Sequence, residues 1–560
     1  MPLAFSHSPP ALANQPMRLL KHLILKHLPL FFLIVYTCPM IFLGLSDSVL
    51  QVDEGADTFI STTLLKFGLP MHSDGINSSM LFADVYDGLF VYRPWFSYYA
   101  QALSLSVIGQ TTFAARLPFA LIGVFSVIFF YRFSLKFTGR PFIAFLAAFL
   151  LASSIPALIY FRTARYVGVP ILLTVLLLNF YVDIYKNKKW NPFPLTVVSI
   201  IFFHTMYVEF AGMIAGILIH FFIHIKETLP GNRKRAAWAA GITGLFCIPW
   251  FIFIFPVFSQ VSQYWASNST LIDPSWQGFP KRFIGFLFQV NNYIFPLILL
   301  PLLLFRQLRP FAKQTSLLLL CSLTMLLTAL PHLMPLQQYI SSSFPLLFLL
   351  LAILLTSIIP KHRLLASFLA ALLITTNLIH VGPLIPLKAL VKDRPEWFQK
   401  SPYLKNVYLS LIREVQIKSV YFEYLYELTH VYRGPLDEVV KFFKTHGKPG
   451  DSCYIDSEFE SLAFYTGMKM IENQDLSQQH PPDWIVLRGK VNPFKKSEEI
   501  SPEARNVKEV LQANAYTRIE LDAPAIWVNN TYDIQIHEFR SPSSVDKVTV
   551  YQRTDYSSNR

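Results

Sequence analysis

The chain reads FALIGVFSVIFFYRFSLKFTGRPFIAFLAAFLLASSIPALIYFRTARYVGVPILLTVLLLNFYVDIYK over residues 119–186. Three apolar runs follow one another here, each close to the roughly 20 residues that a helix needs to cross a bilayer. Lys and Arg cluster after the first run, at 132–140, and again at 186–189. This alternation predicts consecutive membrane-spanning helices joined by short connections.

The same pattern extends over most of the 560 residues, of which 53% are hydrophobic and only 15% are charged. That composition is too apolar for a water-soluble domain of this length. We therefore predict an all-α polytopic membrane domain of about eleven transmembrane helices. The expected spans are 27–45, 113–131, 141–160, 167–185, 193–209, 211–225, 237–258, 283–305, 315–332, 338–359 and 364–382.

The flanking charges predict an orientation, because Lys and Arg next to spans stay in the cytoplasm. If the N-terminus is cytoplasmic, the clusters at 18–26, 132–140, 186–189, 226–235, 306–313 and 361–363 share that side. We expect a multi-pass protein of the plasma (inner) membrane whose C-terminal domain is extracytoplasmic. Charges nearly balance beyond residue 382, so cytoplasmic loops facing anionic lipid explain the net charge of +13 and no nucleic-acid partner is indicated.

Three zones are expected along the chain: a cytoplasmic N-terminus (1–26), a membrane domain (27–382) with a long outer loop (46–95), and a soluble mixed α/β domain (383–560). In the last zone, strand-like runs alternate with helical ones. The strand-like runs are 419–425, 453–456, 484–487, 518–521, 533–539 and 547–551, and the helical runs are 436–446 and 504–513.

The outer loop carries carboxylates directly after the first span. Asp53 and Glu54 would lie at the membrane surface, and Asp57 would share a helix face with Asp53 if this stretch is helical. A carboxylate placed here could accept a proton from a hydroxyl group. The alternative is a structural one, in which Asp53 or Glu54 caps the start of a helix.

Three arginines on the outer side could bind a phosphate. Arg93 precedes Pro94, which favours the first turn of a helix, and helix N-termini bind anions. Arg162 and Arg165 lie outside against the trend of the other basic residues. The alternatives are an interfacial position for Arg93 and ordinary ion pairs with acidic residues for Arg162 and Arg165.

Further ionisable or polar groups fall at the outer ends of later spans and are secondary candidates, with a structural role as the alternative. They are His204, Glu209, His332 and Tyr339. No His/Cys cluster with ligand spacing occurs, so no metal site is predicted and a divalent cation on oxygen ligands is the one cofactor left open.

The order of these motifs resembles a known family. Asp53-Glu54, then Arg93-Pro94, then the run 106–109 through Ala115-Arg116-Leu117-Pro118 is similar to the bacterial relatives of the dolichyl-phosphate-mannose protein mannosyltransferases and the lipid A aminoarabinose transferase, of the GT-C fold class. The resemblance is best over residues 25–170, and residues 462–467 also look like the tails of bacterial members.

The resemblance implies a membrane glycosyltransferase that moves a hexosyl or pentosyl group, with inversion, from a polyprenyl-phosphate-linked donor to a lipid, glycan or protein hydroxyl on the outer face. It implies that Asp53 is the base or positions the acceptor, with Glu54 beside it, and that Arg93 contacts the donor phosphate. Arg162 and Arg165 correspond loosely to an outer arginine region. The aminoarabinose transferases have Lys-Pro-Pro where this chain has Arg93-Pro94-Trp95, so the sugar and the acceptor stay open.

A transporter or flippase of a lipid-linked precursor is the alternative function. Such proteins tend to have broken helices with charged residues near the bilayer midplane. Here the ionisable residues gather at one face, which favours chemistry at the membrane surface.

Overall fold

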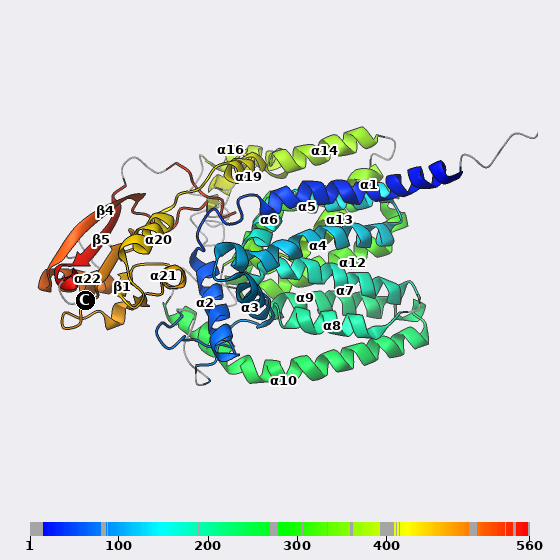
Figure 1. The fold of residues 1–560 in the computed structure, drawn as a ribbon. Helices are drawn as coiled ribbons and strands as arrows, with labels where there is room; N and C mark the ends of the chain where they lie inside the picture. The colour runs from blue at the N-terminus through cyan, green and yellow to red at the C-terminus, as the bar shows by residue number, and fades with distance from the viewer. Residues whose placement is uncertain are drawn as a thin grey trace, which may run out of the picture.

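A computed structural model describes residues 15–79, 86, 88–188, 190–268, 278–304, 306–332, 334–358, 362–392, 408–409, 411–413, 415–491, 501–531, 534–540 and 545–557. Most of its helices form one elongated bundle, and its strands form a sheet in a separate lobe at one end of that bundle (Figure 1). Part of the expected cytoplasmic N-terminus, residues 1–14, and part of the expected outer domain, residues 393–407, lie outside the described residues.

The bundle contains the apolar helices that the sequence predicts. They are α1 (Gln15–Phe42), α4 (Thr112–Thr138), α5 (Pro141–Ala152), α6 (Ile155–Arg162), α7 (Val169–Tyr185), α8 (Pro192–Phe203), α9 (Tyr207–Ile223), α10 (Pro230–Asn268), α11 (Phe279–Tyr293), η4 (Leu297–Leu304), α12 (Ala312–Ala329), α13 (Ser343–Ile358), α14 (Arg363–Thr375), α15 (Leu378–Val381) and α16 (Ile385–Lys392).

Among the described residues, four helices are long and apolar enough to cross a membrane, and the number rises to 7 if each bent helix pair counts as one span. The three bent pairs turn by 60°, 86° and 87°, and four further apolar helices are 10–17 residues long. These are the helices of an integral membrane protein. Each of the eleven expected segments contains helix among its described residues, but the number of crossings stays a prediction.

Local sequence explains where the helices begin and end. The Thr111 side chain accepts a hydrogen bond from the Ala114 N–H at the start of α4, and Gly139 ends the helix with a φ of +69°. The break between α5 and α6 lies at Ser153 and Ser154, just before Pro156. The Ser-Ser pair and the proline together stop one helix and start the next.

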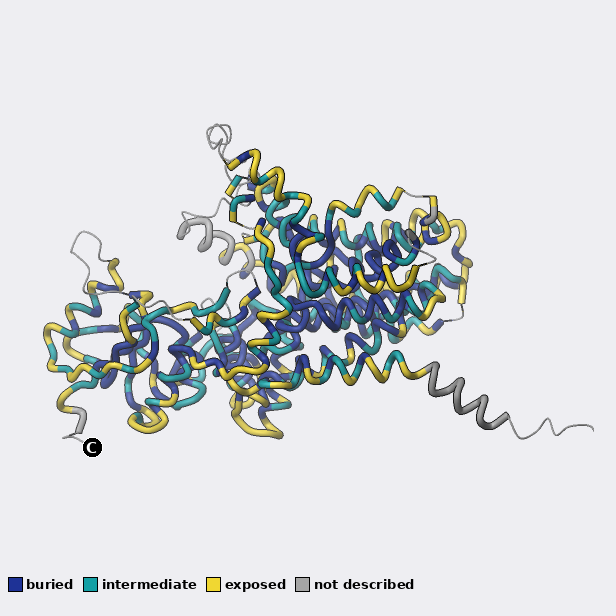
Figure 2. The backbone as a smooth tube through the Cα atoms, turned by 90° about the horizontal axis from the view of Figure 1, so that it is seen from above, coloured by how far each residue is buried: buried dark blue, intermediate teal, exposed yellow. Residues whose placement is uncertain are grey.

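The residues at the centre of the bundle are mostly buried (Figure 2), and many large hydrophobic side chains are exposed on its outside, as a bilayer requires. Two glycines of α9 allow the closest approach. Gly212 and Gly216 face α12, where a Cβ on Gly216 would lie 2.6 Å from the Cα of Cys321. The two helices therefore pack backbone to backbone.

Helix α2 (Val52–Phe67) of the outer loop and helix α3 (Phe96–Ile108), which follows the loop, lie across the end of the bundle that faces the lobe (Figure 1). The start of α2 has a capping box between Gln51 and Glu54. Its end has Gly68 at φ +76°, donating to the Leu64 carbonyl. Helix α2 of the predicted functional loop and the helix that follows the loop, α3, thus lie between membrane domain and lobe.

The lobe is a five-stranded sheet with helices on both faces. Its strand order is β2-β1-β3-β5-β4, with β1 parallel to β2 and β3, and β5 antiparallel to β3 and β4. The elements are α20 (Pro435–His446), β1 (Ser452–Ile455), α21 (Phe459–Thr466), β2 (Lys469–Met470), β3 (Trp484–Leu487), α22 (Pro502–Ala513), β4 (Tyr516–Pro524) and β5 (Lys547–Arg553). Apolar side chains of α20 and α21 pack on one face of the sheet, and those of α22 pack on the other.

Four of the six predicted strands and both predicted helices of this region are confirmed. The strand expected at 419–425 is wrong, because α19 (Val420–Thr429) occupies it. Ser419 caps this helix, and Tyr424 and Leu428, four residues apart, are buried on one face. The run at 533–539 is not a strand over its described residues, which form one isolated bridge from His537 to Asn530, and residue 533 lies outside them.

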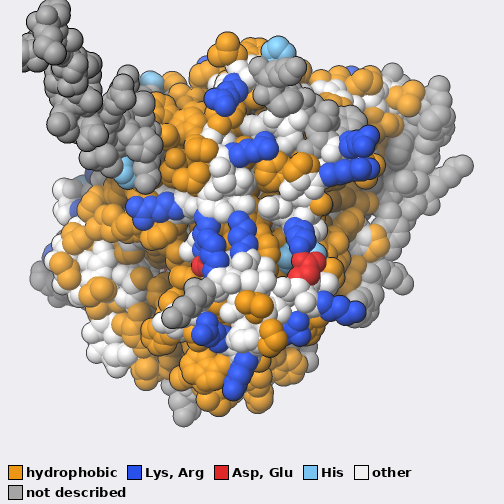
Figure 3. Space-filling view, turned by 90° about the vertical axis from the view of Figure 1, so that its right-hand side faces the viewer, with side chains coloured by type: hydrophobic (Ala, Val, Ile, Leu, Met, Phe, Trp, Pro, Cys, Tyr) orange, Lys and Arg blue, Asp and Glu red, His pale blue; other side chains and the backbone are white. Residues whose placement is uncertain are grey.

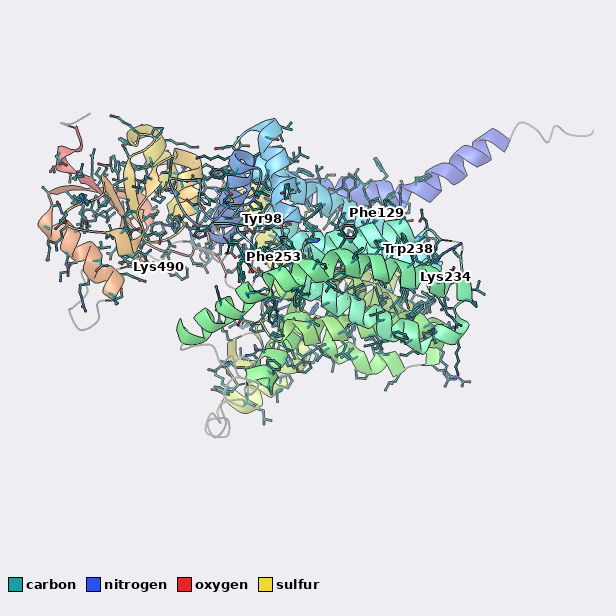
Figure 4. All side chains as sticks on the ribbon, turned by 90° about the horizontal axis from the view of Figure 1, so that it is seen from below. Tyr98, Phe129, Lys234, Trp238, Phe253 and Lys490 are labelled. Carbon is teal, nitrogen blue, oxygen red and sulfur yellow. The ribbon has the colours of Figure 1, made fainter. Side chains whose placement is uncertain are left out.

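The two ends of the molecule differ in charge. Lys and Arg side chains are spread over the end that faces away from the lobe, where Asp and Glu are few (Figure 3). Lys234 lies at that end, whereas Lys490 lies on the lobe at the other (Figure 4). Lys and Arg side chains of the described residues, Lys234 among them, are therefore numerous at the end of the bundle opposite the α/β lobe.

Candidate active site

The three carboxylates at the start of α2, those of Asp53, Glu54 and Asp57, lie in different surroundings. Asp57 and Glu54 are buried, with exposed fractions of 1% and 6% for the whole residue, whereas the side chain of Asp53 is 39% exposed. Asp53 and Asp57 lie one turn apart on the same face of the helix, as predicted. Asp53 is therefore the carboxylate of this turn that is open to a ligand.

Two arginines lie against Asp53. Arg165, in the connection between α6 and α7, places Nη2 2.8 Å from Asp53 Oδ2. Arg93, shortly before α3, places Nη2 3.8 Å from Asp53 Oδ1 and Nη1 2.5 Å from Asp57 Oδ1. Tyr98 of α3 donates its hydroxyl to the same Asp57 oxygen at 2.9 Å. Two carboxylates and two guanidinium groups from three parts of the chain thus form one cluster.

The charges of this cluster affect the two aspartates differently. The Arg165 guanidinium, aided by Arg93, lowers the pKa of Asp53 below its ordinary value against the effect of burial. Burial raises the pKa of Asp57 despite the same two arginines. Asp53 is thus held ionised at neutral pH.

Glu54 belongs to a separate ion pair. Arg116 of α4 donates to both Glu54 oxygens, at 2.9 and 2.8 Å, and the Ala164 N–H donates to one of them at 2.8 Å. The same arginine donates to the carbonyls of Leu45 and Ser48, at 2.9 and 3.1 Å. Burial raises the pKa of Glu54, but these contacts outweigh it and leave the pKa below its ordinary value. Glu54 and Arg116 join α2, α4 and the end of the first span.

Arg162 is not brought into the Asp53 cluster. Its guanidinium donates to the carbonyls of Ile41, Leu43 and Gly44, at 2.9, 2.6 and 3.3 Å, where α1 ends. It also lies 5.9 Å from the centre of the Tyr424 ring. Arg162 thus satisfies the free carbonyls of a helix end, a role that its residue type alone did not distinguish from phosphate binding.

Two of the secondary candidates are held at the ends of α8 and α9. Glu209 is buried and accepts hydrogen bonds from the Ser342 N–H at 2.7 Å, the Ser342 hydroxyl and the Ser341 hydroxyl. His204 accepts the Phe96 N–H on its carbonyl at 3.1 Å. Both contacts tie helix ends together.

The other two secondary candidates stack on each other. The rings of His332 and Tyr339 are parallel, with centroids 3.7 Å apart. Tyr339 follows Gln338, whose side-chain oxygen accepts from Arg165 at 3.0 Å. These residues therefore lie behind the arginine that contacts Asp53.

A cavity of about 390 Å³ opens beside Asp53. One wall is lined by residues of α2, α4, α6 and the α6–α7 connection, including Asp53, Glu54, Arg116, Arg162 and Arg165. Residues of α19 and of the lobe line the other wall, namely Tyr424, Glu427, Trp527, Val528, Asn530, Thr531, Gln535 and His537. The site is thus enclosed between membrane domain and lobe, the junction beside which Tyr98 lies in Figure 4.

The lobe residues of this wall were missed by sequence reasoning. All residues of this wall lie more than 370 positions beyond Asp53 along the chain. Tyr424, for example, contacts Met40 at a separation of 384 residues. The one local signal was an aromatic and amide-rich loop, from Trp527 to Asn530, because functional residues are common on loops.

No group of three or more His, Cys, Asp or Glu side chains suited to a metal ion occurs among the residues that the structure describes. The carboxylates at the start of α2 are instead bound by guanidinium groups. No ligand set for a divalent cation is identified.

No family model and no curated protein matches the chain. Solved structures do. ArnT from Cupriavidus metallidurans in the apo state is 13% identical, with a TM-score of 0.53, and the match covers 94% of this chain and 98% of that one. ArnT bound to undecaprenyl phosphate gives 13% identity, a TM-score of 0.49 and the same coverage. The oligosaccharyltransferase AglB from Archaeoglobus fulgidus, in complex with an inhibitory peptide and a dolichol-phosphate, gives 11% identity and a TM-score of 0.39, over 83% of this chain and 69% of that one.

The likeness to apo ArnT spans nearly the whole of both chains, which includes the membrane helices and the α/β lobe. It agrees with the resemblance carried by Asp53-Glu54 and Arg93-Pro94. The chain therefore has the fold of ArnT, the aminoarabinose transferase whose family the motifs of its outer loop resemble.

Proposed function

We propose that this chain is a membrane glycosyltransferase that moves a sugar from a polyprenyl-phosphate-linked donor to an acceptor hydroxyl on the extracytoplasmic face. One observation carries the proposal. Asp53, ionised and partly exposed, lies 2.8 Å from Arg165 at a cavity of about 390 Å³. A proton acceptor and a phosphate-binding cation are thus adjacent, which glycosyl transfer from a phosphate requires.

The proposed reaction is a single displacement. Asp53 accepts the proton of the acceptor hydroxyl, and the oxygen forms a bond to the anomeric carbon. The bond from that carbon to the phosphate oxygen breaks, and its electron pair leaves on the polyprenyl phosphate. Attack from the side opposite the leaving group inverts the anomeric configuration.

The arginines stabilise the leaving group in this scheme. Phosphate gains negative charge as the bond breaks, and guanidinium groups bind phosphate through paired N–H donors. Arg165 is 6% exposed and keeps its position through Gln338, while Arg93 is held by Asp57. Arg162, engaged with the end of α1, contributes by shaping the cavity wall.

The outer face is proposed from the distribution of charge. Basic residues cover the end of the bundle opposite the lobe (Figure 3), and such residues stay in the cytoplasm. The Asp53 cavity lies at the other end, beside the lobe, where a lipid-linked sugar made in the cytoplasm and flipped outward would be used.

The test is an assay with purified protein and synthetic polyprenyl-phosphate sugars, in which mass spectrometry of the lipid measures loss of the sugar. We expect free polyprenyl phosphate to accumulate in the presence of an acceptor. For the variant Asp53→Asn, the matched control is Asp47→Asn, because Asp47 is an exposed carboxylate of the same loop. If none of the tested combinations of donor sugar and acceptor yields free polyprenyl phosphate, the proposal is rejected.

A transporter of a lipid-linked precursor is a second candidate, favoured by one observation. Three helix pairs are bent by 60–87°, and their breaks meet around Ser153, Asn292 and Asn377. Broken helices are common in transporters. This candidate requires the lipid to cross the bilayer of sealed vesicles with its mass unchanged, so the same mass measurement separates the two functions.

A further inference from the structure

The segment that leads into α2, residues 49–52 and here called the lead-in segment, is held by the lobe. The Val49 N–H donates to Asp437 Oδ1 at 3.0 Å, and the Leu50 N–H donates to the Tyr465 hydroxyl at 2.9 Å. The Val52 N–H donates to Glu458 Oε1 at 2.9 Å. Three of the four amide groups before Asp53 therefore depend on side chains more than 380 residues away, as the separations of 388, 415 and 406 show.

The backbone of the lead-in segment is strained. Val52 has a φ of +36°, a conformation that is highly unfavourable for a β-branched residue. Such strain persists only where surrounding contacts impose it, and it gathers at functional sites. Among the described residues four non-glycines have a positive φ; two of them, Val52 and Gln535, line the Asp53 cavity, and a third, Glu458, is the partner of Val52.

Glu458 is itself fixed in place. Its other carboxylate oxygen forms an ion pair with Arg488, and the two side chains are 5% and 3% exposed. Glu458 precedes α21 with a φ of +62°. One oxygen is thus used inside the lobe, and the other reaches out to the strained residue before Asp53.

We propose that Glu458 is a positioning residue for Asp53: the lobe holds Val52 in its strained conformation and so aims the carboxylate of the next residue at Arg165 and the cavity. This inference rests on the function proposed above. It assigns Glu458 of the lobe a part in catalysis that acts through the backbone of the lead-in segment and not through contact with substrate.

The physical reason is the short distance along the chain. Val52 is the first residue of α2, and a return to ordinary extended geometry would rotate the first turn of the helix, which carries Asp53. The Asp53 side chain has one close partner, Arg165 at 2.8 Å, and a more distant one, Arg93 at 3.8 Å, so it would follow the backbone. A catalytic carboxylate tolerates little misplacement, because small errors in geometry cost large factors in rate.

The test must separate positioning from simple docking of the lobe. Glu458 is replaced together with Arg488, so that no unpaired charge is buried. Glu458→Gln/Arg488→Met keeps an oxygen for the Val52 N–H, whereas Glu458→Leu/Arg488→Met removes it. Each pair is made with Val52 and with Val52→Gly, because glycine adopts a positive φ without strain.

With Val52 present, the Leu pair should have a kcat about 10- to 100-fold below that of the Gln pair, while the KM for the donor changes little. With Val52→Gly, the difference should shrink to less than about threefold, because the strain that Glu458 holds is gone. An equal difference in both backgrounds would mean that Glu458 acts on lobe stability alone and would overturn the proposal.

A second measurement is independent of enzyme activity. Hydrogen exchange in the full-length protein should show the amides of residues 49, 50 and 52 protected, and the Leu pair should lose protection at residue 52 while the lobe strands keep theirs. If residue 52 stays protected, the proposal fails whatever the activity. If the wild-type chain transfers no sugar but the exchange pattern is as expected, the proposed function fails and the attachment of the lead-in segment to the lobe stands.

Discussion

Asp53 and Glu54 are adjacent in the sequence but differ in environment. The Asp53 side chain is 39% exposed at the cavity, and that of Glu54 is 8% exposed and bound at both oxygens by Arg116. Two acidic residues with different surroundings commonly divide the roles of chemistry and support. Here Asp53 faces the cavity, and Glu54 holds the helix that presents it.

Replacing Asp53 tests this division. Asp53→Asn keeps the shape of the side chain but cannot accept a proton, so we expect kcat to fall by about 100- to 10,000-fold. The ion pair that it loses is partly exposed, so the melting temperature should stay within a few degrees of the wild-type value. The assay is sugar transfer by purified protein, with Asp47→Asn as the control. Activity of Asp53→Asn within a few-fold of wild type would remove Asp53 from the mechanism.

The acid limit of activity is a second test at this scale. Asp53 acts only when ionised, and Arg165 keeps its pKa below the ordinary value of 3.8, so activity should remain constant from neutral pH down to about pH 5. Arg165→Gln removes the main cause of that shift, so the acid limb should move to higher pH. The ion pair also contributes stability that is present above the unfolded-state pKa and is lost as pH falls through the folded one. An unchanged acid limb in Arg165→Gln would show that another group governs it.

At the scale of elements, the contact between α2 and α21 connects membrane domain and lobe. Gly55 of α2 faces Ser461 of α21, and a Cβ on Gly55 would lie 1.9 Å from the Ser461 Oγ. This is far below any normal contact, so the two helices meet at a position where only glycine fits. The contact lies two residues from Asp53.

Gly55→Ala should therefore weaken the contact between α2 and α21. We expect a loss of about 1–3 kcal/mol in the stability of this contact and a lower transfer rate. The second substitution Ser461→Gly removes the clashing hydroxyl and should restore much of both, since the glycine then lies on the other helix. Thermal unfolding and transfer assays on the two variants check this. No recovery in the double variant would mean that the alanine acts through α2 alone.

Helices and strands were predictable where their own pattern sufficed. The apolar runs from 119 to 186 predict α4 to α7, and the short, continuous apolar run at 484–487 marks β3. The run at 419–425 did not reveal its true structure, because Tyr and Phe favour strands locally. The packing of Tyr424 and Leu428 against the membrane helices selects a helix instead. Bends such as the 86° turn between α11 and η4 depend on packing and leave little trace in hydropathy.

The candidate site was predictable in part for a similar reason. Asp53, Arg93 and Arg165 stand out because charges at a membrane surface need partners, and the structure brings these three together. Arg162 shows the same signal but binds helix-end carbonyls, a difference made by a few ångströms of side-chain geometry. The contribution of Glu458 is invisible in the sequence, because it depends on the strained φ of Val52 and on contact across 406 positions.

At the scale of the whole molecule, the charge asymmetry predicts which end faces the cytoplasm. Lys490 lies on the lobe and Lys234 at the opposite, basic end (Figure 4). In a variant with Cys38→Ala, whose other cysteines are buried, we expect a membrane-impermeant maleimide to label Lys490→Cys but not Lys234→Cys on intact cells stripped of their outer layers. Both should be labelled after permeabilisation. The reverse pattern on intact cells would place the lobe in the cytoplasm and reject the proposed topology.

The cavity wall is assembled from segments that are far apart in the polypeptide: the side chains of Gln51 and His537 are hydrogen-bonded across 486 positions. A growing chain inserts its membrane helices long before the ribosome has made the last part of that wall. A polypeptide that stops short, even one with every helix inserted, therefore has an open pocket and an unsupported Asp53. For the proposed enzyme, we therefore expect transferase competence to appear only after the lobe has been synthesised and has docked on the membrane helices.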